Sequence, residues 1–251
     1  MIVHFVGAGP GDPELLTIKA TGLIQRAKIC IYAGSLVTQM ILNLLPDDCE
    51  CHNSAGLTLE QILQLFVMAK DRNVDVVRLH SGDPCIYGAT REQMNILDSI
   101  GIDYDVTPGI SAFQASAAVL RKELTIPEKN QTVIISRVGN RTAVPEYQHL
   151  SQLAKLRSTL CLYLSVQQIV EIAKELTPYY GKDCPVAVVE KVSWPDERII
   201  RGTLSNIGAK VQELKIQSTA IIMVGDALTS SQAKSCLYSQ KFSHTFRQTT
   251  T

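Results

Sequence analysis

The sequence lacks an apolar run long enough to cross a membrane, and no charged-then-apolar leader stands before its first strand-like segment. It also lacks an excess of one charge, since 24 Lys and Arg balance 24 Asp and Glu, which argues against a nucleic-acid-binding surface spread over the chain. The 251 residues are 45% hydrophobic and 19% charged, a composition that supports one or two sizeable cores. We therefore expect a soluble protein of the cytoplasm that binds neither nucleic acid nor a membrane.

Pairs of metal ligands at zinc-site spacing are missing as well. The seven cysteines are scattered and odd in number, and four lie in or beside apolar runs, which favours reduced thiols. The stretch Cys49-Glu50-Cys51-His52 resembles half of a metal clip but has no second ligand pair, and the five histidines form no close pair. The sequence therefore predicts no metal site.

The most informative segment is a glycine-rich turn, residues 4–17 (HFVGAGPGDPELLT), between an apolar strand and an amphipathic helix. Clustered glycines at such a junction often let a ligand approach the backbone. A dinucleotide turn would need a third glycine where Asp12 stands and an acid about 20 residues further on, and a phosphate loop would need Gly-Lys-Ser/Thr after Gly11. Neither pattern is present, and Asp12 is interpreted as a helix N-cap, with Pro13 at the first helical position.

The first half of the chain alternates strand and helix patterns. Leu16, Ala20, Leu23 and Ala27 share one helical face, and Thr58 with Gln61 fits a capping box. Such alternation predicts an α/β fold with a largely parallel sheet. The expected strands are residues 2–6, 28–32, 74–80 and 103–106.

The composition changes after about residue 131, and a second α/β domain is expected there. A turn-rich stretch, residues 190–197, separates two of its strands and predicts an antiparallel hairpin. With residues 120–130 as the linker, we expect an N-terminal domain over residues 1–126, a C-terminal domain over 127–240 and a tail over 241–251, with the ligand in a cleft between the domains. The expected strands are residues 132–136, 158–164, 185–189, 198–204 and 219–224, and the expected helices are residues 166–177 and 205–214.

Two further glycine turns follow strands, residues 80–88 (HSGDPCIYG) and 106–112 (VTPGISA). Because the loops of a parallel sheet emerge at the carboxyl ends of its strands, the three turns are expected to converge. Each turn alone is a weak signal, and Asp83 in the second is interpreted either as a ligand contact or as a helix cap before Pro84.

The three turns together resemble the tetrapyrrole methylases, also called class III or precorrin methyltransferases. The resemblance covers nearly the whole chain, and within the family the precorrin-4 C(11)-methyltransferases of cobalamin synthesis are the most similar branch. Other branches, such as the uroporphyrinogen-III methyltransferases, usually carry glycine where Ser81 stands. The residues that carry the family resemblance are 6–17 (VGAGPGDPELLT), 82–84 (GDP), 107–111 (TPGIS), 185–188 (PVAV), 193–197 (SWPDE) and 201–204 (RGTL), and those that carry the branch are 32–37 (YAGSLV), 79–84 (LHSGDP) and 139–146 (GNRTAVPE).

The resemblance implies S-adenosylmethionine as methyl donor, S-adenosylhomocysteine as product, a tetrapyrrole as substrate and a homodimer. No catalytic side chain is identified, because an activated donor requires alignment and exclusion of water rather than a nucleophile. Substrate contacts are expected from Arg137 and Arg141, since basic side chains suit a precorrin with many carboxylates, and from Tyr87, which could face the macrocycle. The donor contacts that the resemblance implies are Pro10, Ser81, Gly82, Asp83, Ile86, Ser111, Ala112, Leu164, Ala187, Thr219 and Ala220.

Three other interpretations stay open. A sister methylase could act at another ring position, a non-enzymatic module could bind S-adenosylmethionine without turnover, and a nicotinamide dehydrogenase could use the glycine turns despite the missing ribose acid. The sequence does not decide whether the substrate contains cobalt.

Overall fold

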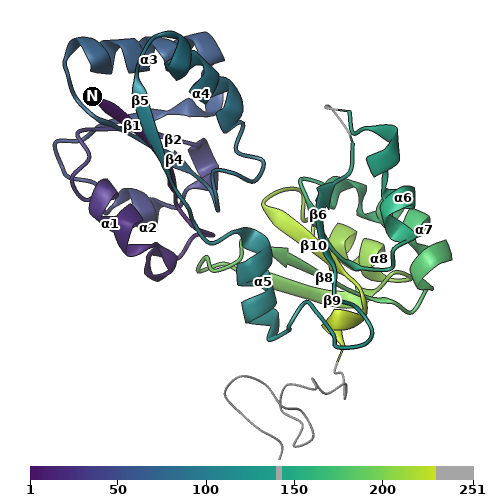
Figure 1. Cartoon of the computed structure of the whole chain (residues 1–251). Helices are drawn as coiled ribbons and strands as arrows, with labels where there is room; N and C mark the ends of the chain where they lie inside the picture. The colour runs from purple at the N-terminus through teal and green to yellow at the C-terminus, as the bar shows by residue number, and fades with distance from the viewer. Residues whose placement is uncertain (140–142, 230–251) are drawn as a thin grey trace, which may run out of the picture. The chain divides into compact units, whose positions relative to one another are not determined.

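The computed structural model describes residues 1–139 and 143–229 (Figure 1). Their contacts divide them into two units, of which unit 1 comprises Met1–Ser116 with Lys191–Arg198 and unit 2 comprises the rest of the described chain. The division falls inside helix α5 (Ala112–Leu120), whereas the sequence suggested residue 126. The functional domain boundary stays a prediction, and so does the tail, which lies outside the described residues.

Unit 1 is built on a five-stranded sheet in the order β3-β2-β4-β1-β5, and all of its neighbouring strands are parallel. This confirms the predicted α/β class and parallel sheet. Val3, Phe5 and Val6 of β1 are fully buried, as expected for a central parallel strand covered on both faces. The strands are β1 (Ile2–Gly7), β2 (Ile29–Tyr32), β3 (Glu50–Asn53), β4 (Val76–His80) and β5 (Asp103–Thr107).

Strand β3 was not predicted from the sequence. Its residues, Glu-Cys-His-Asn, alternate between half-buried and exposed and contain no apolar run. It lies at the edge of the sheet, where only one neighbouring strand is needed and a polar strand is tolerated. The stretch considered as a metal clip is therefore largely this edge strand, and among the described residues no group of three His, Cys, Asp or Glu side chains could hold a metal ion.

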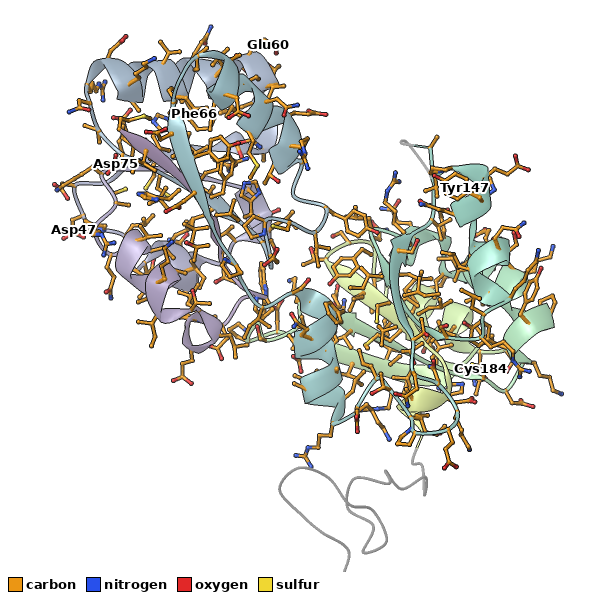
Figure 2. The ribbon with its side chains drawn as sticks, in the orientation of Figure 1. Asp47, Glu60, Phe66, Asp75, Tyr147 and Cys184 are labelled. Atoms are coloured by element: carbon orange, nitrogen blue, oxygen red, sulfur yellow. The ribbon has the colours of Figure 1, made fainter. Side chains whose placement is uncertain are left out.

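Helices cover both faces of this sheet, as Figure 1 shows. Ala20 and Leu23 of α1 and Ile41 of α2 pack with Val6 and Leu79 on one face. On the other face Phe66 of α3 is 1% exposed and lies between its helix and the sheet (Figure 2). The helices of unit 1 are α1 (Ile18–Ile24), α2 (Gln39–Leu42), α3 (Leu59–Asp71), α4 (Thr90–Ser99) and the first half of α5.

The first glycine turn leads into a helix later than the sequence suggested. Asp12 is an N-cap, as predicted, and its side chain accepts the Glu14 N–H at 2.9 Å, but it caps only the 3-10 turn Pro13–Leu15. The chain is extended at Thr17, whose own side chain caps α1. One continuous helix from Pro13 was therefore wrong, because two capping residues five positions apart divide the segment.

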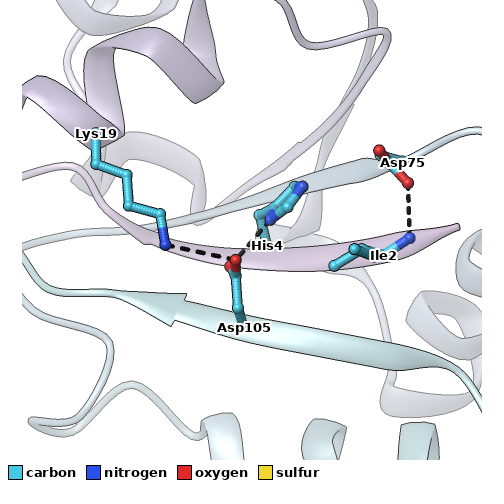
Figure 3. Close-up of polar contacts among 5 residues, drawn as sticks. All are labelled: Ile2, His4, Lys19, Asp75 and Asp105. Atoms are coloured by element: carbon cyan, nitrogen blue, oxygen red, sulfur yellow. Dashed lines mark hydrogen bonds and ion pairs between the residues drawn. The ribbon is translucent and has the colours of Figure 1, made fainter.

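Polar contacts hold the edge strand β5 and the start of β1 in place (Figure 3). His4 Nδ1 lies 2.9 Å from Asp105 Oδ1, its partner in the β1–β5 register, and Lys19 of α1 lies 3.5 Å from the other carboxylate oxygen. The Asp75 carboxylate accepts the Ile2 N–H at 2.6 Å. These side chains fix the register of β1. The sequence suggested no role for them.

Unit 2 contains a mixed sheet in the order β6-β7-β10-β8-β9. Strands β6 and β7 are parallel, and β10 is antiparallel to both β7 and β8. Strands β8 and β9 are neighbours joined by a short loop, as the hairpin prediction requires. The strands are β6 (Val133–Arg137), β7 (Thr159–Tyr163), β8 (Pro185–Glu190), β9 (Arg198–Thr203) and β10 (Ala220–Val224).

Ile172 and Leu176, from one helix of unit 2, pack against Leu160 and Ile222 of this sheet. The predicted helices are α7 (Ile169–Tyr180) and α8 (Ile207–Glu213), and the short α6 (Leu150–Ala154) was not predicted. No helix in residues 1–139 and 143–229 is long and apolar enough to cross a membrane. The six described cysteines are free thiols, as expected.

Candidate functional site

Three glycine turns lie side by side at one edge of the sheet of unit 1. They follow β4, β1 and β5, which are consecutive in the strand order, so their carboxyl ends are neighbours. Gly9 and Gly82 exchange two backbone hydrogen bonds, at 3.2 and 2.8 Å, which join the first turn to the second. The predicted convergence of the turns is confirmed, and such an edge is where open α/β sheets commonly bind ligands.

The three turns approach so closely that only glycine fits at their meeting point. A Cβ added to Gly7 would stand 2.5 Å from the Gly109 nitrogen and 2.7 Å from the Gly82 carbonyl oxygen. A Cβ added to Gly109 would also collide with that carbonyl. Gly7 and Gly109 are therefore required by packing between loops rather than by a ligand.

Gly9 and Gly82 differ from these two glycines. Both have a φ of +64°, and the position of a Cβ is clear of other atoms to 3.4 Å at Gly9 and 3.6 Å at Gly82. Their backbone is bare on a side that a side chain would otherwise cover. This is the geometry expected where a ligand approaches the main chain.

Asp83 connects the second turn to the third. Its Oδ1 accepts the Cys85 N–H at 2.8 Å and its Oδ2 accepts the Gly109 N–H at 3.0 Å. The interpretation as a helix cap is wrong in one respect, because α4 begins only at Thr90, and Asp83 caps a turn instead. Both carboxylate oxygens already accept backbone hydrogen bonds. The expected contact of Asp83 with a bound ligand therefore stays a prediction.

The remaining predicted residues of unit 1 surround these turns. Ser81 and Ile86 are half-buried, and Tyr87 is 45% exposed with a φ of 54°. Ser111 is buried before α5, and its N–H donates to the Gln114 side chain at 3.0 Å, one half of a capping box. Ala112 is the first residue of α5. The structure thus brings together all of the unit 1 positions at which donor contacts were expected.

One contact with the first turn was missed in the sequence. The loop Lys191–Arg198 counts with unit 1, and its Trp194 Nε1 donates to the Pro10 carbonyl at 2.8 Å. Ser193 Oγ accepts the Asp12 N–H at 3.0 Å. Residues 193–197 carried part of the family resemblance but no role, and nothing in the local pattern indicates a partner 184 positions away.

The predicted residues of unit 2 lie at strand ends, with one exception. Leu164 follows β7 with 70% of its surface exposed and a φ of 54°, and Thr219, with a φ of 52°, precedes Ala220 at the start of β10. Ala187 is 2% exposed inside β8, so its side chain is covered. Leu164 is the strongest candidate of this set, because a large exposed apolar side chain held in a left-handed conformation has no packing role in its own unit.

Only one of the two predicted substrate arginines can be described. Arg137 ends β6 and donates to the Ala143 carbonyl at 3.1 Å, whereas Arg141 lies outside the described residues. Arg78 of β4 is 5% exposed and donates to the Gln93 side chain at 3.0 Å and to the Ile31 carbonyl at 3.3 Å. Arg78 therefore supports the sheet below the turns.

A buried histidine stands directly before the second turn. His80 is 4% exposed, its Nε2 has no hydrogen-bond partner among the described residues, and its ring lies 5.9 Å from that of Phe5. Burial, and then the charge of Arg78, lower the pKa of His80 to about 3. The imidazole is consequently neutral at physiological pH, and a charged role near the turns is excluded for it.

Comparison with known proteins shows the family to which this chain belongs. The family described as Tetrapyrrole (Corrin/Porphyrin) Methylases matches residues 2–208. A precorrin-4 C(11)-methyltransferase of Pseudomonas aeruginosa is 45% identical over 98% of this chain and 99% of its own length. The crystal structure of a cobalt precorrin-4 methyltransferase is 39% identical, with a TM-score of 0.89 over 91% of this chain and 96% of its own.

A third relative was solved with a ligand. The uroporphyrin-III C-methyltransferase of Thermus thermophilus, complexed with S-adenosylhomocysteine, is 30% identical, with a TM-score of 0.77 over 91% of this chain and 99% of its own. The family match covers most of the sequence, and these relatives match it nearly end to end. The protein with the three interlocked glycine turns is thus a member of the tetrapyrrole methylase family.

Proposed function

We propose that this protein transfers a methyl group from S-adenosylmethionine to C(11) of precorrin-4 or of its cobalt form. The observation that carries the proposal is the end-to-end similarity, at 45% identity, to a relative named for this reaction. The branch-specific segments in the sequence, with Ser81 in place of a glycine, support the same regiochemistry.

The described residues fit the methyl donor. Gly9 and Gly82 leave backbone bare beside the turns, and Leu164 offers an exposed apolar surface that suits an adenine. Backbone groups and apolar side chains match a ligand whose sulfonium needs shape and carbonyl oxygens more than a charged partner. Ser81, Ile86, Ser111 and Ala112 are the other residues of unit 1 that would line the donor site.

When bound, S-adenosylmethionine supplies an already activated methyl group, so no side chain has to act as a nucleophile. The chain's own residues then have two tasks, to hold the reactants in line and to exclude water. Alignment of this kind contributes about 7–11 kcal/mol to lowering a barrier. The interlocked turns serve this purpose because Gly7 and Gly109 pack against neighbouring backbone with no space between the loops, and Asp83 fixes the second turn to the third.

The carboxylates of the substrate require basic partners. Arg137 is a candidate, since it is half-buried at a strand end, whereas Tyr87, which is 45% exposed in the second turn, would face the macrocycle itself. Arg141 is a candidate from the sequence alone. A homodimer in the cytoplasm belongs to the same proposal. The family resemblance supports the dimer, and light scattering after size-exclusion chromatography tests it.

The test is the position of the transferred methyl group. The purified protein is incubated with methyl-labelled S-adenosylmethionine and a supply of precorrin-4, with and without cobalt, and the product is analysed by carbon NMR. We expect the label at C(11), and comparison of the two incubations identifies the preferred substrate. Label at another ring carbon would indicate a sister methylase, whereas donor binding without any methylated tetrapyrrole would indicate a binding module.

A further inference from the structure

Several contacts within the loop Lys191–Arg198 stabilise its conformation. Lys191 forms an ion pair with Asp196, and its ammonium lies 5.7 Å from the centre of the Trp194 ring. The Ser193 N–H donates to the Glu197 carboxylate at 2.8 Å. Lys191 and Ser193 also adopt left-handed backbone conformations, with φ of 48° and 66°. These contacts define one shape for the loop and one direction for the Trp194 side chain.

The same loop forms two hydrogen bonds with the first glycine turn. Trp194 Nε1 donates to the Pro10 carbonyl, and Ser193 Oγ accepts the Asp12 N–H. Between them, a Cβ added to Gly11 would collide with Cδ1 and Nε1 of Trp194. The indole therefore lies directly against the Gly11 backbone, and the absence of a side chain at Gly11 is what allows the contact.

The Pro10 carbonyl is the part of the turn that needs such a restraint. The ring of proline fixes φ of Pro10, so its remaining backbone freedom is rotation about ψ, which swings the carbonyl. Gly9 and Gly11 on either side are the most permissive residues, with φ of +64° and +153°. A hydrogen bond to the carbonyl restricts the rotation about ψ of Pro10 and so fixes the peptide group between two flexible glycines.

We propose that Trp194 is a positioning residue, which holds the turn around Pro10 in the conformation that receives the methyl donor. The inference rests on the proposed donor site, since Pro10 is one of its members. Fixing a flexible loop before the ligand arrives removes part of the ordering cost of binding, so the gain appears as affinity for the donor.

The variant Trp194→Phe tests the proposal, because it removes the Nε1–H and keeps an aromatic ring against Gly11. Lys28→Met is the matched control, since it removes an exposed ion pair, with Asp48, at the amino end of β2 and leaves the loop Lys191–Arg198 and both of its contacts with the turn intact. Binding of S-adenosylhomocysteine to each full-length protein is measured by calorimetry, together with the melting temperature and the KM for S-adenosylmethionine. A neutral hydrogen bond corresponds to a change of about three- to tenfold in an equilibrium constant.

We expect Trp194→Phe to weaken binding of S-adenosylhomocysteine by about three- to tenfold and to raise the KM for the donor more than it lowers kcat. Ser193→Ala should act in the same direction, and Lys28→Met should bind as the wild type does. Unchanged binding by Trp194→Phe, with or without a lower melting temperature, would overturn the proposal. Failure of the wild type itself to bind S-adenosylhomocysteine would instead refute the donor site.

The wild type offers a second readout. Trp194 is the single tryptophan of the sequence, so tryptophan fluorescence reports on this loop alone. A titration with S-adenosylhomocysteine should change the emission in the wild type and in Lys28→Met at the same ligand concentration that calorimetry gives. An emission that stays constant through saturation would contradict a donor site beside the turn that Trp194 contacts.

Discussion

Asp83 Oδ2 accepts the Gly109 N–H at 3.0 Å, and this bond joins the second glycine turn to the third. The other oxygen of the same carboxylate accepts the Cys85 N–H at 2.8 Å, so a single side chain fixes its own turn and the neighbouring one. An acid at this position is thus explained by loop geometry before any ligand is considered.

We expect Asp83→Asn to destabilise the protein, because an amide has one acceptor oxygen where the two N–H groups require two. Leaving one backbone N–H without a partner costs about 1–3 kcal/mol. The measurement is the free energy of unfolding in urea. Asp12→Asn is the control, since its single bond to the Glu14 N–H is one that asparagine also accepts as an N-cap. Equal stability of the Asp83 and Asp12 variants would contradict the linking role.

Gly7 gives a sharper test of the contact between the turns. An alanine there would place its Cβ 2.5 Å from the Gly109 nitrogen, and backbone atoms cannot move aside as a flexible side chain does. Overpacking of this kind costs about 1–3 kcal/mol or more, so Gly7→Ala should lower the melting temperature clearly. Gly56→Ala, where no atom lies within 4 Å of the new Cβ, should leave it unchanged or slightly higher. Similar melting temperatures for the two variants would show that the turns can separate at little cost.

The sequence was sufficient to predict most strands and the class of the fold. Apolar runs such as those of β1 and β7 identify buried strands whatever their neighbours are. The polar edge strand β3 gave no such signal, because an edge strand needs no apolar faces of its own. The strand order was also inaccessible, although it is the order β4-β1-β5 that makes the three turns adjacent.

The candidate site was predictable only where it consists of local sequence patterns. Glycine turns after strands are local patterns, so the positions of Gly9, Gly82 and Gly109 were found. The contact between Trp194 and Pro10 joins residues 184 positions apart, and neither residue carries a local sign of the other. The segment 193–197 was noticed only through family resemblance, which gave it no physical role.

The buried His80 should make stability depend on pH. Its pKa is about 3 in the folded protein and 6.5 when unperturbed, so between these values the unfolded chain binds the extra proton. Above about pH 6.5, His80 is neutral in both states and does not lower the free energy of unfolding. As the pH falls from 6.5 toward 3, the free energy of unfolding decreases by up to about 1.4 kcal/mol per pH unit. His80→Phe, which cannot be protonated, should flatten the unfolding free energy over this range.

The exposed His149 supplies the control for that experiment. Its side chain lies at the surface, so His149→Gln removes a histidine without disturbing the core of unit 2. Urea unfolding at a series of pH values between 4 and 7, about the window given by the two pKa values, separates the variants. A slope that His80→Phe leaves unchanged would mean that other groups carry the acid sensitivity.

Two leucines of unit 2 allow the proposed donor site to be tested with the same chemical change. Leu164 is 70% exposed and Leu156 is 65% exposed, so the same substitution can be made at two exposed leucines. An aspartate at either position costs little stability, because neither side chain is buried.

In the proposed donor site, however, Leu164→Asp would replace an apolar contact with adenine by a charge. We expect it to weaken binding of S-adenosylhomocysteine by at least about tenfold, the equivalent of about 1.4 kcal/mol, while Leu156→Asp binds normally. If calorimetry gives both variants the affinity of the wild type at equal melting temperatures, Leu164 is not part of the donor site, and its exposure needs another explanation.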